Sequence, residues 1–114
     1  MSNIAKGERR VVVTGLGLMT ALGLDLEKSW NGLINGKSGV TPVKRIDVSK
    51  IACRIAAQIY DFDAKEHMDF KASKRMDRFA QFAVKSSKDT IADSGLIIED
   101  NNAHRVGVLV GSGV

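Results

Sequence analysis

Hydrophobic positions in this chain fall into a few short runs with different periods. Three consecutive valines, Val11 to Val13, are followed closely by Gly15 and Gly17. An unbroken apolar run of this kind indicates a strand buried on both faces, as in parallel sheets that helices cover. Residues 105–111 carry apolar side chains at both odd and even positions. They therefore predict a second strand of the same buried kind.

Helical spacing follows the first of these strands. Leu26, Trp30, Leu33 and Ile34 recur at i, i+4, i+7 and i+8, which places them on one face of a helix over residues 26–35. The helix is bounded by residue types that favour its two ends: Asp25 is a good N-cap, and Gly36 suits the left-handed residue after a last turn.

A longer helix is expected from about residue 73 to residue 94. Its apolar and small side chains recur at helical spacing, and Gly95 supplies a stop signal. Between the two helices we expect a loop over residues 36–49, which contains Gly39 and Pro42, and a short edge strand over residues 53–60.

The element order is strand, helix, excursion, helix, strand, which predicts an α/β fold with right-handed crossovers. Two doubly buried strands need helices on both faces and neighbouring strands at their edges. Two helices cannot cover all of that surface. We therefore expect the chain to be part of a larger fold, incomplete on its own, with residues 1–8 as a flexible leader.

Composition narrows the possible classes of protein. The 114 residues carry a net charge of +4, which is too small to favour nucleic acid as a partner, since such proteins show a strong basic stripe. No apolar run is long enough to span a bilayer, so no membrane role is expected. Cys53 is the only cysteine, which fits a reducing compartment. We expect a cytoplasmic protein.

The glycine-rich turn after the valines invites comparison with a dinucleotide-binding motif. Gly15 and Gly17 match its first two glycines, but Thr20 stands at the third position, and no acidic residue lies near residues 34–37 to hold a ribose. Tight structural turns explain the glycines more simply. A nucleotide-binding oxidoreductase fragment nevertheless remains an alternative at this point.

Other chemistry-bearing side chains are isolated. Cys53 lies between apolar neighbours in the expected edge strand, which favours a buried structural thiol over a nucleophile. His67 and His104 have no partner at metal-ligand spacing, so no metal site and no cofactor are expected. Ser112 lies between two glycines, but the spacing of a nucleophile elbow fails.

A basic cluster precedes the long helix. Lys71, Lys74 and Arg78 share one side at helical spacing, with Arg75 beside them. Cations at this end of a helix oppose its dipole, which costs some stability and suggests another use. Such a cluster suits an acidic or phosphorylated partner. A merely solvated, charged face is the competing interpretation.

Several of these features together resemble the β-ketoacyl-acyl-carrier-protein synthases, and most closely the type II condensing enzymes of bacterial fatty acid synthesis. The resemblance extends from residue 9 to residue 114, with its motifs in family order and at family spacing. The matching segments are Arg9–Gly23 (RRVVVTGLGLMTALG), Trp30–Leu33, Gly36–Gly39, Asp61–Asp63, Lys74–Phe79, Asp93–Leu96, Arg105–Gly107 and Gly111–Gly113.

The resemblance implies the first part of an N-terminal synthase domain, over residues 9–114, with a thiolase-like fold. Such acyltransferases are homodimers that condense an acyl thioester with malonyl-acyl-carrier protein. Their catalytic Cys and two His residues lie beyond the matched region, and Cys53 matches none of them, so no catalytic residue is expected here. The resemblance assigns acyl-carrier-protein docking to Lys71, Lys74 and Arg75, and the acyl pocket to Val114.

Two hypotheses of function are therefore preferred. In the first, the chain is the N-terminal portion of a 3-oxoacyl-[acyl-carrier-protein] synthase, which is inactive when isolated from the catalytic residues. In the second, it is a non-catalytic, truncated protein that binds acyl carrier protein or a partner subunit.

Overall fold

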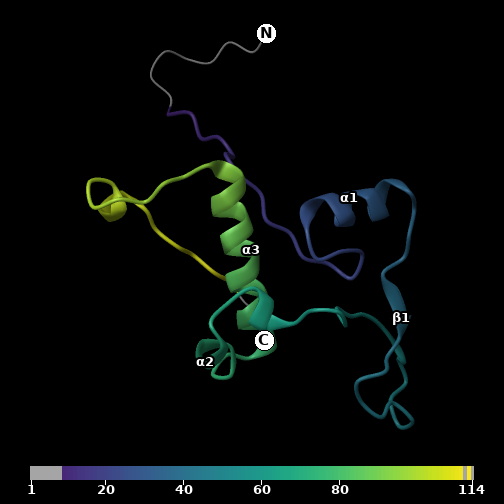
Figure 1. Cartoon of the computed structure of the whole chain (residues 1–114). Helices are drawn as coiled ribbons and strands as arrows, with labels where there is room; N and C mark the ends of the chain where they lie inside the picture. Colours follow the sequence, from purple (N-terminus) through teal and green to yellow (C-terminus); the bar gives the residue numbers. More distant parts are fainter. Residues whose placement is uncertain (1–8, 112, 114) are drawn as a thin grey trace.

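The computed structural model describes residues 9–111 and residue 113, so the expected leader at residues 1–8, and also Ser112 and Val114, lie outside the described residues. Figure 1 shows the longest helix at the centre, with the extended N-terminal segment, residues 9–19, along one side of it. The elements in chain order are α1 (Leu26–Ile34), β1 (Val40–Pro42), β2 (Ile55–Ala57), the 3-10 turn η1 (Ala64–Glu66), α2 (Phe70–Ser73), α3 (Arg78–Ser94) and η2 (Ala103–Arg105).

The first predicted helix is confirmed together with both of its ends. The Asp25 carboxylate accepts a hydrogen bond from the Lys28 backbone N–H at 2.7 Å, which satisfies one free donor of the first turn of α1. Gly36 has φ +63°, and its N–H donates to the Leu33 carbonyl. The apolar face of α1 is nevertheless open, since Trp30 is 57% exposed.

The second predicted helix is interrupted. Residues 74–77 leave the helical conformation between α2 and α3, and Asp77 has the extended geometry of an N-cap (φ −65°, ψ 159°). The Gln81 side chain holds the break, because its Nε2 donates to the backbone carbonyls of Ser73 and Met76 at 2.9 and 3.1 Å. The predicted end of the helix is confirmed: Gly95 is left-handed (φ +64°).

The expectation of two strands buried on both faces is wrong for the described residues. Residues 9–19 and 106–111 form no regular strand, and Val11 and Leu109 are 94% and 99% exposed. A strand is stabilised by hydrogen bonds to a neighbouring strand and by burial of its side chains. No described segment pairs with either run, so both remain extended and unpaired.

The sheet of the described chain is instead a small antiparallel pair. β1 and β2 pair with Thr41 opposite Ala56. The expected edge strand over residues 53–60 is thus confirmed as the shorter β2, whereas β1 lies inside the segment expected to be a loop. Helices and strands are both present, so the coarse α/β assignment holds.

The N-terminal segment lies directly against α3. A Cβ atom built on Gly17 would come within 3.0 Å of the Thr90 hydroxyl and backbone nitrogen, and one on Gly15 within 3.0 Å of the Ser94 backbone nitrogen. Neither glycine has positive φ. These glycines therefore serve close approach to a helix, and not the tight turns that the sequence suggested. The Leu16 N–H also donates to the Asp93 carboxylate at 2.8 Å.

Buried apolar side chains are scarce. Phe62 is the only buried hydrophobic residue among those the structure describes, and it contacts Phe82 edge-on at 5.1 Å between ring centroids. The radius of gyration is 18.4 Å, whereas a compact domain of this length would have about 13 Å. The described chain is therefore an open arrangement whose elements leave most apolar surface uncovered.

Polar contacts hold the turn before α1 against α1 and α3. Lys85 of α3 is buried, and its ammonium group contacts Asp89 and donates to the Leu24 carbonyl at 3.4 Å. The Ser29 hydroxyl of α1, also buried, donates to the Gly23 carbonyl at 3.0 Å. These bonds fix the turn that precedes α1 against both helices. None of the helices in the described part of the chain is long and apolar enough to cross a lipid bilayer.

Candidate functional site

The candidate site is a basic surface formed by Lys71, Lys74 and Arg75 around the end of α2. Asp69 begins this helix, since its carboxylate accepts from the Ala72 N–H at 2.9 Å. Lys71 lies within α2, whereas Lys74 and Arg75 lie in the break that follows it. The predicted alignment of Lys71, Lys74 and Arg78 along one helix face is therefore wrong, because the break separates Arg78 from α2; Lys71, Lys74 and Arg75 are all exposed.

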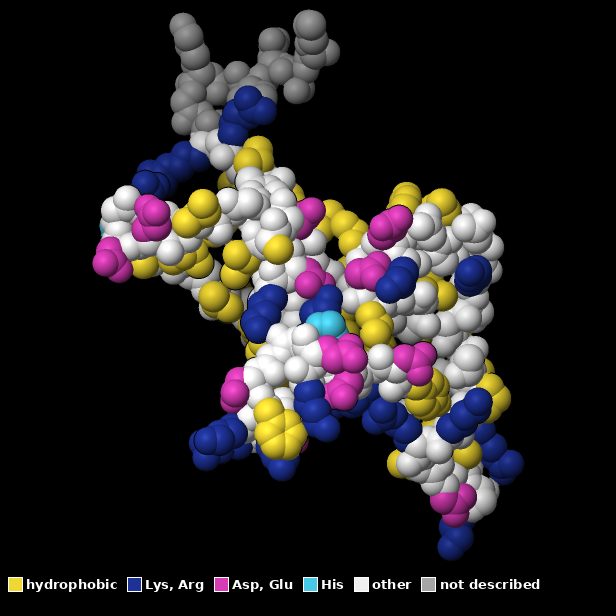
Figure 2. Space-filling view, in the orientation of Figure 1, with side chains coloured by type: hydrophobic (Ala, Val, Ile, Leu, Met, Phe, Trp, Pro, Cys, Tyr) yellow, Lys and Arg dark blue, Asp and Glu magenta, His cyan; other side chains and the backbone are white. Residues whose placement is uncertain are grey.

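The charges of this basic surface are not neutralised by ion pairs with other described residues. Within the described ranges the ion pairs are Lys28 with Asp25 and Lys85 with Asp89. Figure 2 shows Lys and Arg side chains gathered along the lower part of the molecule, around the position of α2 and toward the end of the β1 region. Unpaired, exposed cations of this kind attract an acidic surface and steer its approach.

Arg78 has a different role from the one that its sequence position suggested. Its guanidinium donates to the Ile59 carbonyl at 2.8 Å and lies over the rings of Phe62 and Phe82, at 5.6 and 5.0 Å. Burial, and secondarily the charge of Arg45, lower the pKa of Arg78. This arginine joins residues 59–62 to α3 and is not part of the free basic surface.

Phe70 is a residue that the sequence interpretation missed. It is the first residue of α2 and is 46% exposed, and the ammonium groups of Lys65 and Lys74 lie over its ring at 5.5 and 4.3 Å from the centroid. The available signal was an aromatic residue four positions before a lysine in a basic segment, since i and i+4 side chains meet on a helix.

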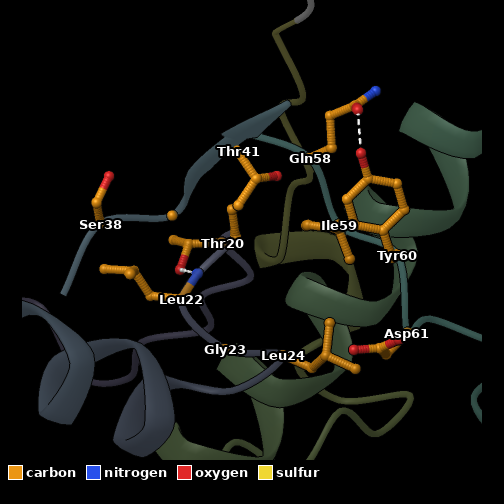
Figure 3. A pocket seen from close by; sticks show the side chains of 12 residues that line it. Thr20, Leu22, Gly23, Leu24, Ser38, Thr41, Gln58, Ile59, Tyr60 and Asp61 are labelled. Atoms are coloured by element: carbon orange, nitrogen blue, oxygen red, sulfur yellow. Dashed lines mark hydrogen bonds between the residues drawn. The ribbon is translucent and has the colours of Figure 1, made fainter. Parts of the chain in front are cut away.

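A separate polar cavity of about 210 Å³ lies between the turn before α1 and the strands β1 and β2. Figure 3 shows the Tyr60 hydroxyl directed at the Gln58 side chain, with which it forms a hydrogen bond. Thr20 and Asp61 also line the cavity. Its described lining residues carry hydroxyl groups and the Asp61 carboxylate, but no histidine, cysteine or lysine.

The glycine-rich turn does not have the geometry of a nucleotide site. Gly15 and Gly17 face the backbone of α3, which occupies the place that a phosphate would need. The following helix, α1, has the Asp25 carboxylate at its N-terminus, and hydrogen bonds from Lys28 lower the pKa of that carboxyl group. A permanent negative charge there would repel a pyrophosphate.

The isolated Cys and His residues are not brought together. Cys53 is exposed, so the expectation of a buried thiol is wrong. It lies before the first residue of β2, and its neighbours at positions 51–55 are also exposed. Its Sγ lies 3.5 Å from the Ile55 carbonyl. The His67 ring stacks on Phe62 with a 5.3 Å centroid separation, whereas His104 lies in η2 and is exposed.

Comparison with known proteins identifies the family to which the chain belongs. Residues 8–114 match the family model described as the N-terminal domain of β-ketoacyl synthases. The chain belongs to the β-ketoacyl synthase family. The match covers all the motifs that carried the resemblance, including the basic segment and the final glycines.

Similar synthases come from several bacteria. The chain is 46% identical over all of its 114 residues to 3-oxoacyl-[acyl-carrier-protein] synthase 2 of Synechocystis sp., of which it covers 27%. It is 46% and 40% identical to the enzymes of the same name from Coxiella burnetii and Vibrio harveyi, with 94% of the chain matched in each case. The chain thus spans about a quarter of the length of these relatives.

A solved structure supports the same placement within the synthase family. The ishigamide ketosynthase/chain length factor matches 78% of this chain with a TM-score of 0.67 and 32% sequence identity, and 22% of that structure is covered. Most of the chain therefore has the arrangement of a part of a larger ketosynthase fold.

Proposed function

We propose that this chain is the N-terminal portion of a 3-oxoacyl-[acyl-carrier-protein] synthase, an acyltransferase that condenses acyl thioesters with malonyl-acyl-carrier protein in fatty acid elongation. The observation that carries the proposal is the 46% identity along the entire chain to the Synechocystis synthase 2. In this proposal the chain supplies scaffold and docking surfaces, and residues outside it supply the catalytic Cys and His groups.

The proposed fold is thiolase-like. The apolar runs at residues 11–13 and 108–110, which are exposed in the described chain, would pair with strands of the remaining synthase and become buried. Val114 is proposed to line the acyl pocket, although it lies outside the described residues. We also propose a cytoplasmic homodimer, and light scattering of the complete enzyme would test its oligomeric state.

The basic surface is proposed to dock the acyl carrier protein. Lys71, Lys74 and Arg75 are exposed and have no ion-pair partner among the described residues. A carrier protein with an acidic surface would be attracted by these charges before the acyl group reaches the catalytic centre. Attraction between exposed charges falls with salt, because the Debye length is only about 8 Å near 0.15 M ionic strength.

The test is charge reversal in the complete synthase, by Lys71→Glu, Lys74→Glu and Arg75→Glu together. We expect kcat/KM for carrier-bound substrates to fall roughly ten- to a hundredfold, since each exposed pair contributes up to about 1 kcal/mol. Small acyl thioesters that lack the carrier should react almost normally. Added salt should raise the KM for the carrier substrate in the unmutated enzyme, and less steeply in the variant.

A matched control changes the net charge equally at other exposed cations. Reversing Lys37, Lys50 and Arg105 should leave kcat/KM for carrier-bound substrates within about twofold, because these residues lie in other segments of the chain. If both triple variants lose activity equally, or if carrier-free substrates suffer as much as carrier-bound ones, the cations form only a solvated charged face.

A non-catalytic protein that binds acyl carrier protein or a partner subunit is the second candidate. It is favoured by the exposed basic surface, whose cations have no ion-pair partner among the described residues and can bind an acidic partner without catalysis. The coding sequence that follows residue 114 separates the two candidates. Continuation into a segment with one Cys and two His residues supports the synthase, whereas a stop codon there supports the binding protein.

A further inference from the structure

Phe70 holds an unusual position within the basic surface. An aromatic ring that is 46% exposed stands at the start of α2, directly before Lys71. Its backbone is fixed, because Asp69 caps the helix and the Ser73 hydroxyl donates to the Phe70 carbonyl at 2.9 Å. The ring is therefore presented by an ordered turn in the middle of a cationic segment.

The ring also brings two cations together. Lys65 comes from η1 and Lys74 follows α2, yet both ammonium groups lie over the Phe70 ring, at 5.5 and 4.3 Å from its centroid. Two like charges would otherwise repel each other. The negative face of an aromatic ring attracts both, which holds them near one apolar centre. Lys65 is exposed and has no ion-pair partner among the described residues.

A groove begins at this centre. It has a volume of about 620 Å³ and is lined by Phe70 and Met76 among its apolar side chains, and by Lys65 and Lys74. Asp63 is the one acidic residue among the described residues that line it. The groove thus brings apolar side chains next to positively charged ones, which fits a partner of the opposite charge that carries an apolar side chain.

We propose that Phe70 is the apolar centre of the docking surface and that Lys65 belongs to that surface. This inference rests on the proposed function, and its occupant is an acidic segment of the acyl carrier protein. Carboxylates of that segment meet Lys65 and Lys74, while one apolar side chain covers the Phe70 ring. Aromatic residues surrounded by a polar rim often carry much of the energy of such contacts.

The experiment uses three single variants of the complete synthase: Phe70→Ala, Phe70→Leu and Lys65→Gln. Calorimetric titration with acyl carrier protein gives Kd, and steady-state assays give KM and kcat. We expect Phe70→Ala to raise both Kd and KM for the carrier roughly five- to twentyfold with kcat retained. Phe70→Leu keeps apolar area without a π face, so its effect should be smaller.

Salt dependence separates the two kinds of contact. Phe70→Ala should leave the slope of log Kd against log salt close to that of the unmutated enzyme, because no charge has been removed. Lys65→Gln should make that slope shallower, because one screened attraction is lost. Turnover of small acyl thioesters without the carrier should not change in any of the three variants.

The outcomes separate a failure of this inference from a failure of the proposed docking role. If reversal of Lys71, Lys74 and Arg75 weakens carrier binding but Phe70→Ala and Lys65→Gln do not, the proposed function stands and this inference is overturned. If the triple reversal itself has no effect, the docking role fails first. If Phe70→Ala also lowers carrier-free turnover or the melting temperature, Phe70 supports the fold and is no docking residue.

Discussion

Replacing Gly17 with alanine should separate the N-terminal segment from α3. A Cβ at this position would stand 2.6 Å from the Thr90 hydroxyl oxygen and 2.9 Å from the Thr90 backbone nitrogen, with the Ser86 carbonyl closer still. Ordinary contacts between such atoms begin near 3.5 Å, so the segment would have to retreat by roughly 1 Å. Helix backbone atoms cannot give way as the end of a flexible side chain can.

The retreat would also break the hydrogen bond from the Leu16 N–H to the Asp93 carboxylate, now 2.8 Å long. A bond to a charged group is worth about 1.5–3 kcal/mol, and overpacking adds about 1–3 kcal/mol. Alanine also lowers the conformational entropy of the unfolded chain relative to glycine, which offsets about 0.4–1 kcal/mol of this destabilisation. The net destabilisation should therefore be about 2–5 kcal/mol.

Thermal unfolding of the complete synthase measures this effect. The melting temperature of Gly17→Ala should fall by roughly 2–6 °C, because the shift per kcal/mol becomes smaller as a protein becomes longer. If the Gly17→Ala variant melts at the same temperature as the unmutated enzyme, the close approach of the N-terminal segment to α3 is not present in the folded enzyme.

Three further changes have defined outcomes. Cys53→Ala should leave acyl-enzyme formation by the complete synthase unchanged, because this exposed thiol has no catalytic neighbour among the described residues; loss of the acyl-enzyme, measured by mass spectrometry, would make Cys53 a nucleophile. Asp25→Asn should lose the stabilising effect of a charged N-cap. Its carboxyl pKa is lowered in the folded state by the hydrogen bonds from Lys28. Wild-type stability should therefore exceed that of the variant above about pH 4, and the two should converge below it. A difference in melting temperature that does not change with pH would refute this. The 114-residue chain alone should bind a hydrophobic dye and unfold without a sharp transition, since Phe62 is the only buried hydrophobic residue described; a cooperative calorimetric peak from a monomer would contradict it.

The sequence predicted those parts of the structure that local interactions determine. Asp25 and Gly36 mark the two ends of α1, and Gly95 ends α3, as expected from capping preferences. Capping depends on residues within a few positions of the helix end, so no knowledge of distant segments was needed. The β2 strand was also located, although its antiparallel partner β1 was not.

Predictions that depended on distant segments failed. Burial of the valine run at residues 11–13 requires neighbouring strands, which the described chain does not provide. The break after α2 depends on the Gln81 side chain reaching back to Ser73, which no periodicity encodes. The candidate docking surface was predicted from its charges, whereas Phe70 was missed because its spacing of four positions from Lys74 is a weak signal beside four nearby cations.

The contact between Leu16 and Asp93 has a consequence for biosynthesis. The two residues are 77 positions apart, and ribosomes add roughly 5–20 residues each second. The nascent N-terminal segment, with its valines, must therefore wait about 4–15 seconds before α3 exists to receive it. During that interval it is an unpaired apolar segment on a translating ribosome, which makes it a natural site for a chaperone to bind.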